Sequence, residues 1–377
     1  MYLAYKFRMY PDYKQQKKIN GIFDGQRYAY NYYLTVIKEK GNRYANYYIQ
    51  DSMNNLKKTN ELVAPVRQTY INKIIFRLQD NLKKCENSKF GYPRYKSYLD
   101  RNSFTINEGE YINVNIKTRK IKLPDLGEIK IRGYRSRTRI DGIIRNATVS
   151  REKNGKYYVS VLVYLPDVKR IEPSNIVGID LGIKTLATLS DGNIYENNRY
   201  IEKYEKRIKR CHRELSRKKK ESNNYYKCRK KLNMLYVKLT NARKYYLHKI
   251  TKDVTDNYDI IICEKLSTQE MIENTNLSKK ISDVEFSEIL RQLQYKAKRK
   301  GKHFYQVSEF YPSSQTCSVC DHIDKKYKNL GERIYECNYC QNVLDRDLNA
   351  SINIMFEGLK LFMKDRYTKK HIEYSKI

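Results

Sequence analysis

The chain has 377 residues, enough for two to four domains with a sizeable core. It carries 76 Lys and Arg against 42 Asp and Glu, and a formal net charge of +34 favours a polyanionic partner, most often nucleic acid. No apolar run approaches the roughly 20 residues of a membrane span and no secretory core follows Met1, so we expect a cytoplasmic protein without a membrane partner.

The first half of the sequence predicts a strand, then helices, then many short strands. Residues 1–10 alternate polar and apolar, and Pro11 and Asp12 start a helix. A helical pattern continues to about Lys84, with a loop-rich stretch at 40–64 and a second helix opened by Pro65. The later strands are expected at Ser103–Ile106, Tyr111–Ile116, Lys120–Leu123, Ile129–Ile131, Asn146–Ser150 and Tyr157–Tyr164. Such regular short strands predict a small barrel or sandwich, which the strand at 1–10 would close over a helical insert.

The second half begins after a linker at 166–173 with the stretch IVGIDLGIKTLATLSDG at 176–192. It predicts two strands, with Asp180 at the apolar end of the first and a hairpin turn at Asp191-Gly192. Further along, we expect two basic helices over 199–250, a buried strand at 259–264, an amphipathic helix at 283–299, a strand at 303–307, a helix starting at 345–351 and a frayed tail at 363–377.

Three acidic residues occupy similar places in these elements. Asp180 and Glu264 each end a buried strand, and Asp347 lies at a helix start. Burying a carboxylate is costly unless it meets a cation, although a single such Asp could equally cap a loop. If all three converge, they repel one another unless divalent ions lie between them. Two Mg²⁺ ions ~3.5–4 Å apart can support phosphodiester hydrolysis. Spacing alone does not join acids so distant in the chain.

The two basic helices are candidates for nucleic-acid binding. Residues 199–250 hold 19 Lys and Arg against 4 Glu. The candidate phosphate contacts are Arg217, Lys218, Lys219 and Lys220 at the bend, with Arg243 and Lys249 beyond it. A solvated helical hairpin is the alternative interpretation, but this charge density favours a surface that faces phosphates. The 37 Tyr also supply possible stacking platforms for unpaired bases.

Four cysteines form the pattern C-x2-C-x16-C-x2-C: Cys317, Cys320, Cys337 and Cys340. This spacing predicts one structural Zn²⁺ held by four thiolates, with no open position for catalysis. Four free thiols are the alternative, and His322 could compete as a ligand. The other four cysteines are scattered, as expected of free thiols in a reducing compartment.

Several motifs together resemble one family. In chain order they are KFRMYP, QRYAYN with Arg27 and Asn31, GYPRYKS, GIDLGIKTLAT, LSRKKK, NARKYYLHK, EKLSTQEM, YPSSQTCSVC and DRDLNAS. They span nearly the whole chain and resemble TnpB, the transposon-associated proteins regarded as ancestral to type V CRISPR effectors. Two positions depart from the family pattern: Cys263 stands where a β-branched residue is usual, and Asp321 stands where the family has Gly.

The resemblance implies a multidomain α+β fold: an RNase H-like RuvC nuclease domain with a zinc ribbon, a wedge β-barrel and a helical recognition lobe. The implied segments are a wedge strand at 1–11, the helical lobe at 12–98, the wedge barrel at 99–168, the nuclease domain at 169–312 with its basic insert at 199–250, the zinc ribbon at 313–344, a closing helix at 345–362 and a tail at 363–377.

The resemblance also implies an RNA-guided DNA endonuclease. Its partners would be a guide RNA from the transposon end and double-stranded target DNA beside a short adjacent motif, and we expect a monomer rather than a dimer. The family motifs match Asp180, Glu264 and Asp347 to the catalytic acids that hold two Mg²⁺. Asp345 is then expected to cap the helix. The alternatives are a nuclease-inactive RNA-guided repressor, which would have lost active-site acids, and a transposase on the same fold.

Overall fold

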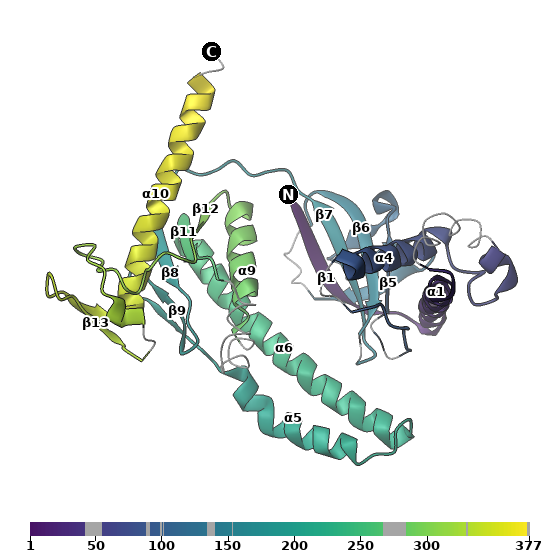
Figure 1. The fold of residues 1–377 in the computed structure, drawn as a ribbon. Coiled ribbons are helices and arrows are strands. Elements are labelled where there is room, and N and C mark those ends of the chain that lie inside the picture. Colours follow the sequence, from purple (N-terminus) through teal and green to yellow (C-terminus); the bar gives the residue numbers. More distant parts are fainter. Residues whose placement is uncertain are drawn as a thin grey trace. The chain divides into compact units, whose positions relative to one another are not determined.

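The structure is a computed structural model that describes residues 1–41, 55–87, 91–98, 100, 102–133, 140–152, 154–266, 284–328 and 331–374. The chain divides into two compact units, Met1–Pro166 and Asp167–Ile377 (Figure 1). Most of the loop-rich stretch predicted at 40–64, and the EKLSTQEM motif beyond residue 266, lie outside the described residues. No helix in the described ranges is long and apolar enough to cross a membrane.

The first unit is built on a seven-stranded antiparallel sheet in the order β2-β6-β7-β1-β5-β4-β3. Its strands are β1 (Tyr2–Tyr10), β2 (Asn102–Ile106), β3 (Asn113–Asn115), β4 (Lys120–Leu123), β5 (Gly127–Arg132), β6 (Ile143–Arg151) and β7 (Tyr157–Tyr164). The first strand pairs with β7 and β5, as predicted. The strand predicted at Tyr111–Ile116 is wrong in part, because a short 3₁₀ helix (Gly109–Tyr111) precedes β3. Within the described residues no pairing links the edge strands β2 and β3.

Two helices pack on this sheet, α1 (Tyr13–Lys40) and α4 (Gln68–Asn87). A capping box between Asp12 and Gln15 starts α1. The prediction that Pro65 opens this second helix is wrong, because Pro65 lies in the turn before α4. Rings of Phe23 and Tyr70, one from each helix, contact Phe104 of β2, with centroid distances of 5.7 and 5.0 Å. Sheet and helices therefore share one core.

The second unit contains a mixed five-stranded sheet in the order β10-β9-β8-β11-β12. The strands are β8 (Ile176–Asp180), β9 (Thr185–Leu189), β10 (Ile194–Glu196), β11 (Ile260–Glu264) and β12 (His303–Val307). The central strands β8, β11 and β12 are parallel, and the hairpin strands β9 and β10 are antiparallel. Parallel strands end at the same edge of a sheet, so Asp180 and Glu264 come to that edge together.

Helices cover both faces of this sheet. On β11, Ile261 and Cys263 face a core that includes residues of α6 (Asn223–Asn257) and α9 (Phe286–Arg299), whereas Ile260 and Ile262 face α10 (Arg346–Tyr374). This alternation is the two-residue period of a strand buried on both faces. The predicted frayed tail after residue 362 is wrong in part, because α10 continues to Tyr374 (Figure 1).

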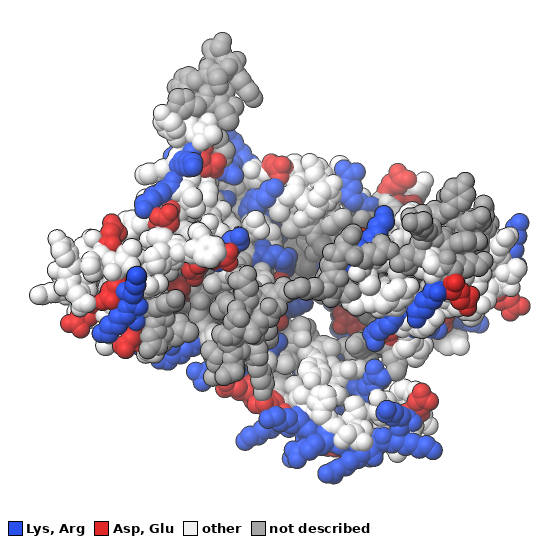
Figure 2. All heavy atoms as spheres, viewed as in Figure 1, with Lys and Arg blue, Asp and Glu red and all other residues white. Residues whose placement is uncertain are grey.

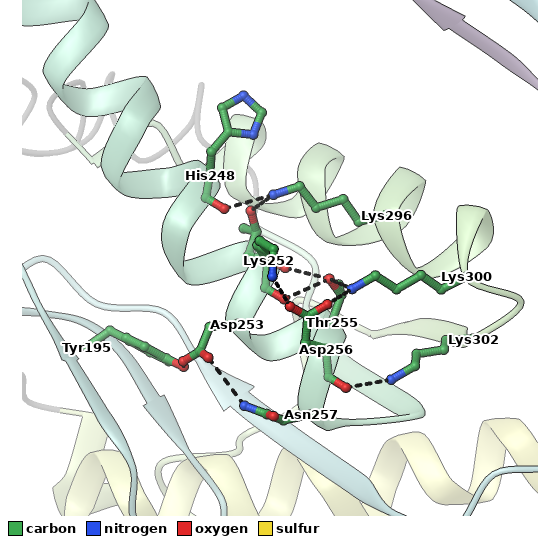
Figure 3. Close-up of polar contacts among 11 residues, drawn as sticks. Tyr195, His248, Lys252, Asp253, Thr255, Asp256, Asn257, Lys296, Lys300 and Lys302 are labelled. Carbon is green, nitrogen blue, oxygen red and sulfur yellow. Dashed lines mark hydrogen bonds and ion pairs between the residues drawn. The ribbon is translucent and has the colours of Figure 1, made fainter. Parts of the chain in front are cut away.

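The helices α6 and α9 meet through polar contacts as well as apolar ones (Figure 3). Thr251 and Gln292 are fully buried and hydrogen-bonded to each other at 2.8 Å. Lys296 of α9 donates to the Thr251 hydroxyl at 2.6 Å, and Lys300 pairs with Asp256 of α6. Burial of these polar groups is tolerated because each has a partner. These contacts fix the position of α9 along the axis of α6.

Candidate active site and metal centre

Three carboxylates from separate elements line one cavity of about 580 Å³ in the second unit. Asp180 is the last residue of β8, Glu264 the last of β11, and Asp347 the second residue of α10. The structure thus places all three predicted acids around one pocket, although they lie far apart in the sequence. It also puts Glu309, Arg333 and Arg346 on the lining.

The electrostatics of the pocket disfavour three bare carboxylates. Burial, followed by the negative charges of Asp347 and Glu264, raises the pKa of Asp180 to about 8. Burial, followed by the charge of Glu309, raises the pKa of Glu264 to about 7. Such shifts mean that nearby positive charge does not fully offset the cost of burying the ionised form. This donor set of hard oxygens fits divalent cations such as Mg²⁺.

Two positive side chains also line the pocket beside the acids. Arg333 lies 3.4 Å from an Asp347 carboxylate oxygen, and Arg346 partly offsets the rise in the pKa of Asp180. Sequence reasoning missed both arginines. The DRD motif placed Arg346 between two acids and could have indicated it, whereas no local pattern marks Arg333. It reaches Asp347 only because the segment before β13 (Ile334–Glu336) returns to the start of α10.

Asp345 has a different role from Asp347. One Asp345 carboxylate oxygen accepts hydrogen bonds from the backbone N–H groups of Asp347 (2.9 Å) and Leu348 (3.1 Å). These donors would otherwise be orphaned at the helix start, so the predicted capping role is confirmed. The carboxylate of Asp347 is left to face the cavity.

The four cysteines converge as the spacing predicted. Their sulfur atoms all lie within 4.8 Å of one another. Cys317 and Cys340 sulfurs are 3.6 Å apart, and so are those of Cys320 and Cys337. A zinc tetrahedron with Zn–S bonds of ~2.3 Å has edges of ~3.8 Å, so this arrangement fits a structural zinc ion. His322 is not in the cluster and instead stacks on Tyr339.

Each cysteine pair ends in a tight turn that requires a left-handed residue. Asp321 has φ of 59° and Gln341 has φ of 58°, directly after Cys320 and Cys340. The TnpB-like pattern has Gly at the first of these positions because Gly adopts this conformation without strain. Asp tolerates it better than most residues, which explains how this chain departs from the pattern without losing the turn.

The cysteine cluster is tied to the helix that carries Asp347. The buried Asn349 donates to the Thr316 carbonyl at 2.7 Å and accepts from the Ser318 N–H at 2.9 Å. One turn later, Asn353 donates to the carbonyls of Ser313 and Thr316. These bonds hold both sides of Cys317 against α10, so the metal centre and the acidic pocket share one support.

The predicted nucleic-acid contacts are placed unequally. Arg217, Lys218, Lys219 and Lys220 are exposed between α5 (Tyr200–Ser216) and α6, and Lys249 is exposed on α6. Figure 2 shows Lys and Arg gathered in the lower part of the view, where Figure 1 shows this hairpin. Arg243, by contrast, is only 13% exposed and pairs with Glu285 at 3.7 Å. Its guanidinium faces protein, which weighs against the predicted phosphate contact.

Comparisons with known proteins agree with this geometry. The family profile described as "Probable transposase" (OrfB_IS605) matches residues 158–275, a "Cas12f1-like, TNB domain" profile matches 286–354, and a "Helix-turn-helix domain" profile matches 1–44. A protein of Escherichia coli K12 assigned as the RNA-guided DNA endonuclease InsQ is 29% identical, covering 94% of this chain and 92% of its own. A TnpB-like protein of Acanthamoeba polyphaga mimivirus is 27% identical over 56% of this chain and 42% of its own.

The chain is similar to TnpB proteins. The first profile includes Asp180 and Glu264 of this chain, and the second includes Asp347 and the four cysteines. A solved structure of a Cas12f1-sgRNA-target DNA complex has the same fold, with a TM-score of 0.53 and 14% identity over 94% of this chain and 98% of that one. The multidomain α+β prediction is confirmed. Despite the name of the third profile, the described part of 1–44 is one strand followed by one helix.

Proposed function

We propose that this chain is an RNA-guided DNA endonuclease, which cuts target DNA beside a short adjacent motif. The observation that carries the proposal is the meeting of Asp180, Glu264 and Asp347 around one cavity. The names of the E. coli relative and of a Streptomyces pristinaespiralis relative, 29% identical over 94% of this chain, support the same activity. Neither a repressor nor a transposase is favoured by any feature of the pocket, and the acids that a repressor would lose are present.

Asp180, Glu264 and Asp347 are the residues that would hold two Mg²⁺ ions. When bound, such ions activate a water molecule and stabilise the leaving oxygen in phosphodiester hydrolysis. The protein's own contribution is to bring three carboxylates to one sheet edge, where their cost of burial favours cation binding. Arg333 and Arg346 place positive charge beside them, which suits a bound phosphate.

The four cysteines would hold one structural Zn²⁺ ion, because a site of four thiolates leaves no position for water. Metal analysis should find about one zinc per chain, and Cys317→Ser should lower the melting temperature. A stable protein without zinc would contradict this assignment.

The cationic surfaces would hold a guide RNA and its duplex with the target strand through the backbone, while base pairing supplies the sequence. A monomer and the finer division of the two units into lobes remain predictions.

The decisive experiment is a cleavage assay with the protein co-purified with its RNA. Matched double-stranded DNA and Mg²⁺ should give cleavage, and Asp180→Ala should reduce it by at least about a hundredfold, the size expected for loss of a group that stabilises charge in the transition state. A target without guide complementarity is the control. Absence of cutting by the wild type, or undiminished cutting by Asp180→Ala, would reject the proposal.

A further inference from the structure

Phe310 is the most exposed large apolar side chain among the described residues. Its exposed fraction is 87%, higher than that of any Tyr in the same set, and Tyr13 follows at 81%. A phenylalanine has no hydroxyl to hydrogen-bond with water. A ring left in solvent to this extent contributes nothing to the core, so it is free to contact a bound molecule.

The exposure of Phe310 does not come from a loose loop. The Phe310 N–H donates to the Ser308 hydroxyl at 3.3 Å, and the Tyr311 N–H donates to the Ser308 carbonyl at 3.1 Å. Val307, which ends β12 just before this turn, is buried. After it, Asn353 of α10 holds the Ser313 carbonyl at 2.8 Å. The turn is thus anchored at both ends, and the ring is presented at a fixed place.

That place is the rim of the acidic pocket. Glu309 and Tyr311, the two neighbours of Phe310, both line the cavity that holds Asp180, Glu264 and Asp347. Successive Cα atoms are only ~3.8 Å apart, so the ring begins within one residue of the cavity wall. A strand whose phosphate entered the pocket would pass its bases close to this ring.

We propose that Phe310 is a positioning residue that stacks on an unpaired base of the cleaved DNA strand, next to the phosphate held by the acidic pocket. The inference rests on the proposed endonuclease function. An aromatic ring can stack on any unpaired base, because every base has a π-face, so stacking adds affinity without sequence preference. It also limits how the strand can slide past the acids, and correct placement of reacting groups is a large part of catalysis.

A nucleic-acid base is favoured over a protein partner for two reasons. The pocket beside the ring carries the groups that suit a bound phosphodiester, and the chain's charge of +34 favours a polyanion. The flanking residues Glu309 and Tyr311 line the same cavity, so the backbone of Phe310 lies within one residue of whatever occupies it.

The test compares Phe310→Ala, Phe310→Leu and Phe310→Tyr in the co-purified RNA complex. Phe310→Ala and Phe310→Leu should lower kcat/KM for matched target DNA by about tenfold, whereas Phe310→Tyr should retain it because a tyrosine ring also stacks. Phe356→Ala is the matched control: Phe356 is 48% exposed on α10 and does not line the cavity. Melting temperature and zinc content should be unchanged, since Phe310 supports no core.

A second readout separates stacking from a structural role. Abasic nucleotides are placed one at a time across the cut site of the cleaved strand. Wild type should lose about tenfold in rate at one position, and Phe310→Ala should lose nothing further there, because ring and base act as one pair. Equal losses in wild type and Phe310→Ala at every position would overturn the proposal, and so would wild-type activity in Phe310→Leu.

The inference can fail separately from the endonuclease proposal. If wild type does not cut, binding of a single-stranded oligonucleotide carrying 2-aminopurine is measured instead. Stacking on the ring should quench the fluorescence with wild type and Phe310→Tyr but not with Phe310→Ala. Identical fluorescence with all three proteins would overturn the stacking role, whether or not the protein cuts DNA.

Discussion

Asp345 and Asp347 lie close together at the start of α10 but have different roles. Asp345 accepts two backbone N–H groups at the start of α10, which uses its charge locally. Asp347 has no such task, and its carboxylate lies on the cavity with Asp180 and Glu264. The difference comes from position relative to the helix axis, because a cap residue must fold back on the first turn.

This division predicts opposite outcomes for two substitutions. Asp347→Asn should abolish Mg²⁺-dependent cleavage with little loss of stability. Asp345→Asn should retain most activity, because Asn is as good a cap as Asp, and Asp345→Ala should cost about 1 kcal/mol of unfolding free energy. Cleavage rates and urea denaturation measure the two effects. Loss of cleavage in Asp345→Asn with retained activity in Asp347→Asn would reverse the assignment.

A second residue-scale prediction concerns Asp256 at the α6–α9 contact (Figure 3). Hydrogen bonds from Lys252 and Lys300 lower the pKa of Asp256 from 3.8 to about 2. A carboxyl with a lower pKa in the folded state contributes stability above the unfolded pKa and loses it as pH falls through the folded pKa. The contribution should therefore be full above about pH 4 and vanish towards pH 2.

Asp256→Asn tests this pH dependence. Near pH 6 the variant should be less stable than wild type by about 1 kcal/mol or less, since the pair is partly exposed and screened by solvent. The difference should shrink as the pH falls from 4 towards 2. Denaturant unfolding at several pH values gives both curves. A gap that stays constant down to pH 2.5 would contradict the linkage.

At the scale of elements, β8 and α10 approach each other closely at Gly178. A Cβ added to Gly178 of β8 would lie 2.1 Å from the Ser351 carbonyl oxygen and 2.6 Å from the Met355 nitrogen. Both are backbone atoms of α10, so neither can move aside alone. This close approach seats the helix that carries Asp347 directly on the strand that carries Asp180.

Gly178→Ala should therefore destabilise the second unit by about 3 kcal/mol and reduce cleavage, because the helix must shift away from the strand. Gly21→Ala is the control substitution. A Cβ added to Gly21 of α1 would meet nothing within 4 Å outside its own helix, so alanine there should be neutral or slightly stabilising. Thermal unfolding and cleavage of both variants measure the contrast. Equal melting temperatures for the two would show that α10 is not seated in this way.

At the scale of the whole molecule, the net charge of +34 predicts strongly salt-dependent nucleic-acid binding. We expect part of this salt dependence to come from the exposed cations at the α5–α6 tip, which are Arg217, Lys218, Lys219 and Lys220. Replacing all four by Gln should reduce the slope of log affinity against log salt for non-specific duplex DNA by about three to four, if each meets one phosphate.

Filter binding or fluorescence anisotropy from low to physiological salt measures this slope. Arg243→Gln is the comparison, because its guanidinium already pairs with Glu285 and should add little to the slope. An unchanged slope in the fourfold variant would place the phosphate contacts elsewhere on the surface.

Local features of the sequence were sufficient to predict many of the structural elements of this protein. The β-branched run before Asp180, the amphipathic period of α9 and the cysteine spacing each depend on neighbours a few residues apart, so pattern alone predicted them. The family motifs predicted which acids belong together. Local signals were misleading in two places. The helix expected at Pro65 begins only at Gln68, and the helix expected to end near residue 362 continues to Tyr374, because packing or chain geometry decides these boundaries.

The tertiary structure alone decided how these pieces form a site. Parallel pairing of β8 and β11 brings Asp180 and Glu264 to one edge, and Gly178 lets α10 approach closely enough to add Asp347. Arg333 joins the pocket, and Phe310 stands at its rim, through contacts between residues far apart in the chain. Such contacts depend on strand order and backbone separation, which no residue pattern of a few positions encodes.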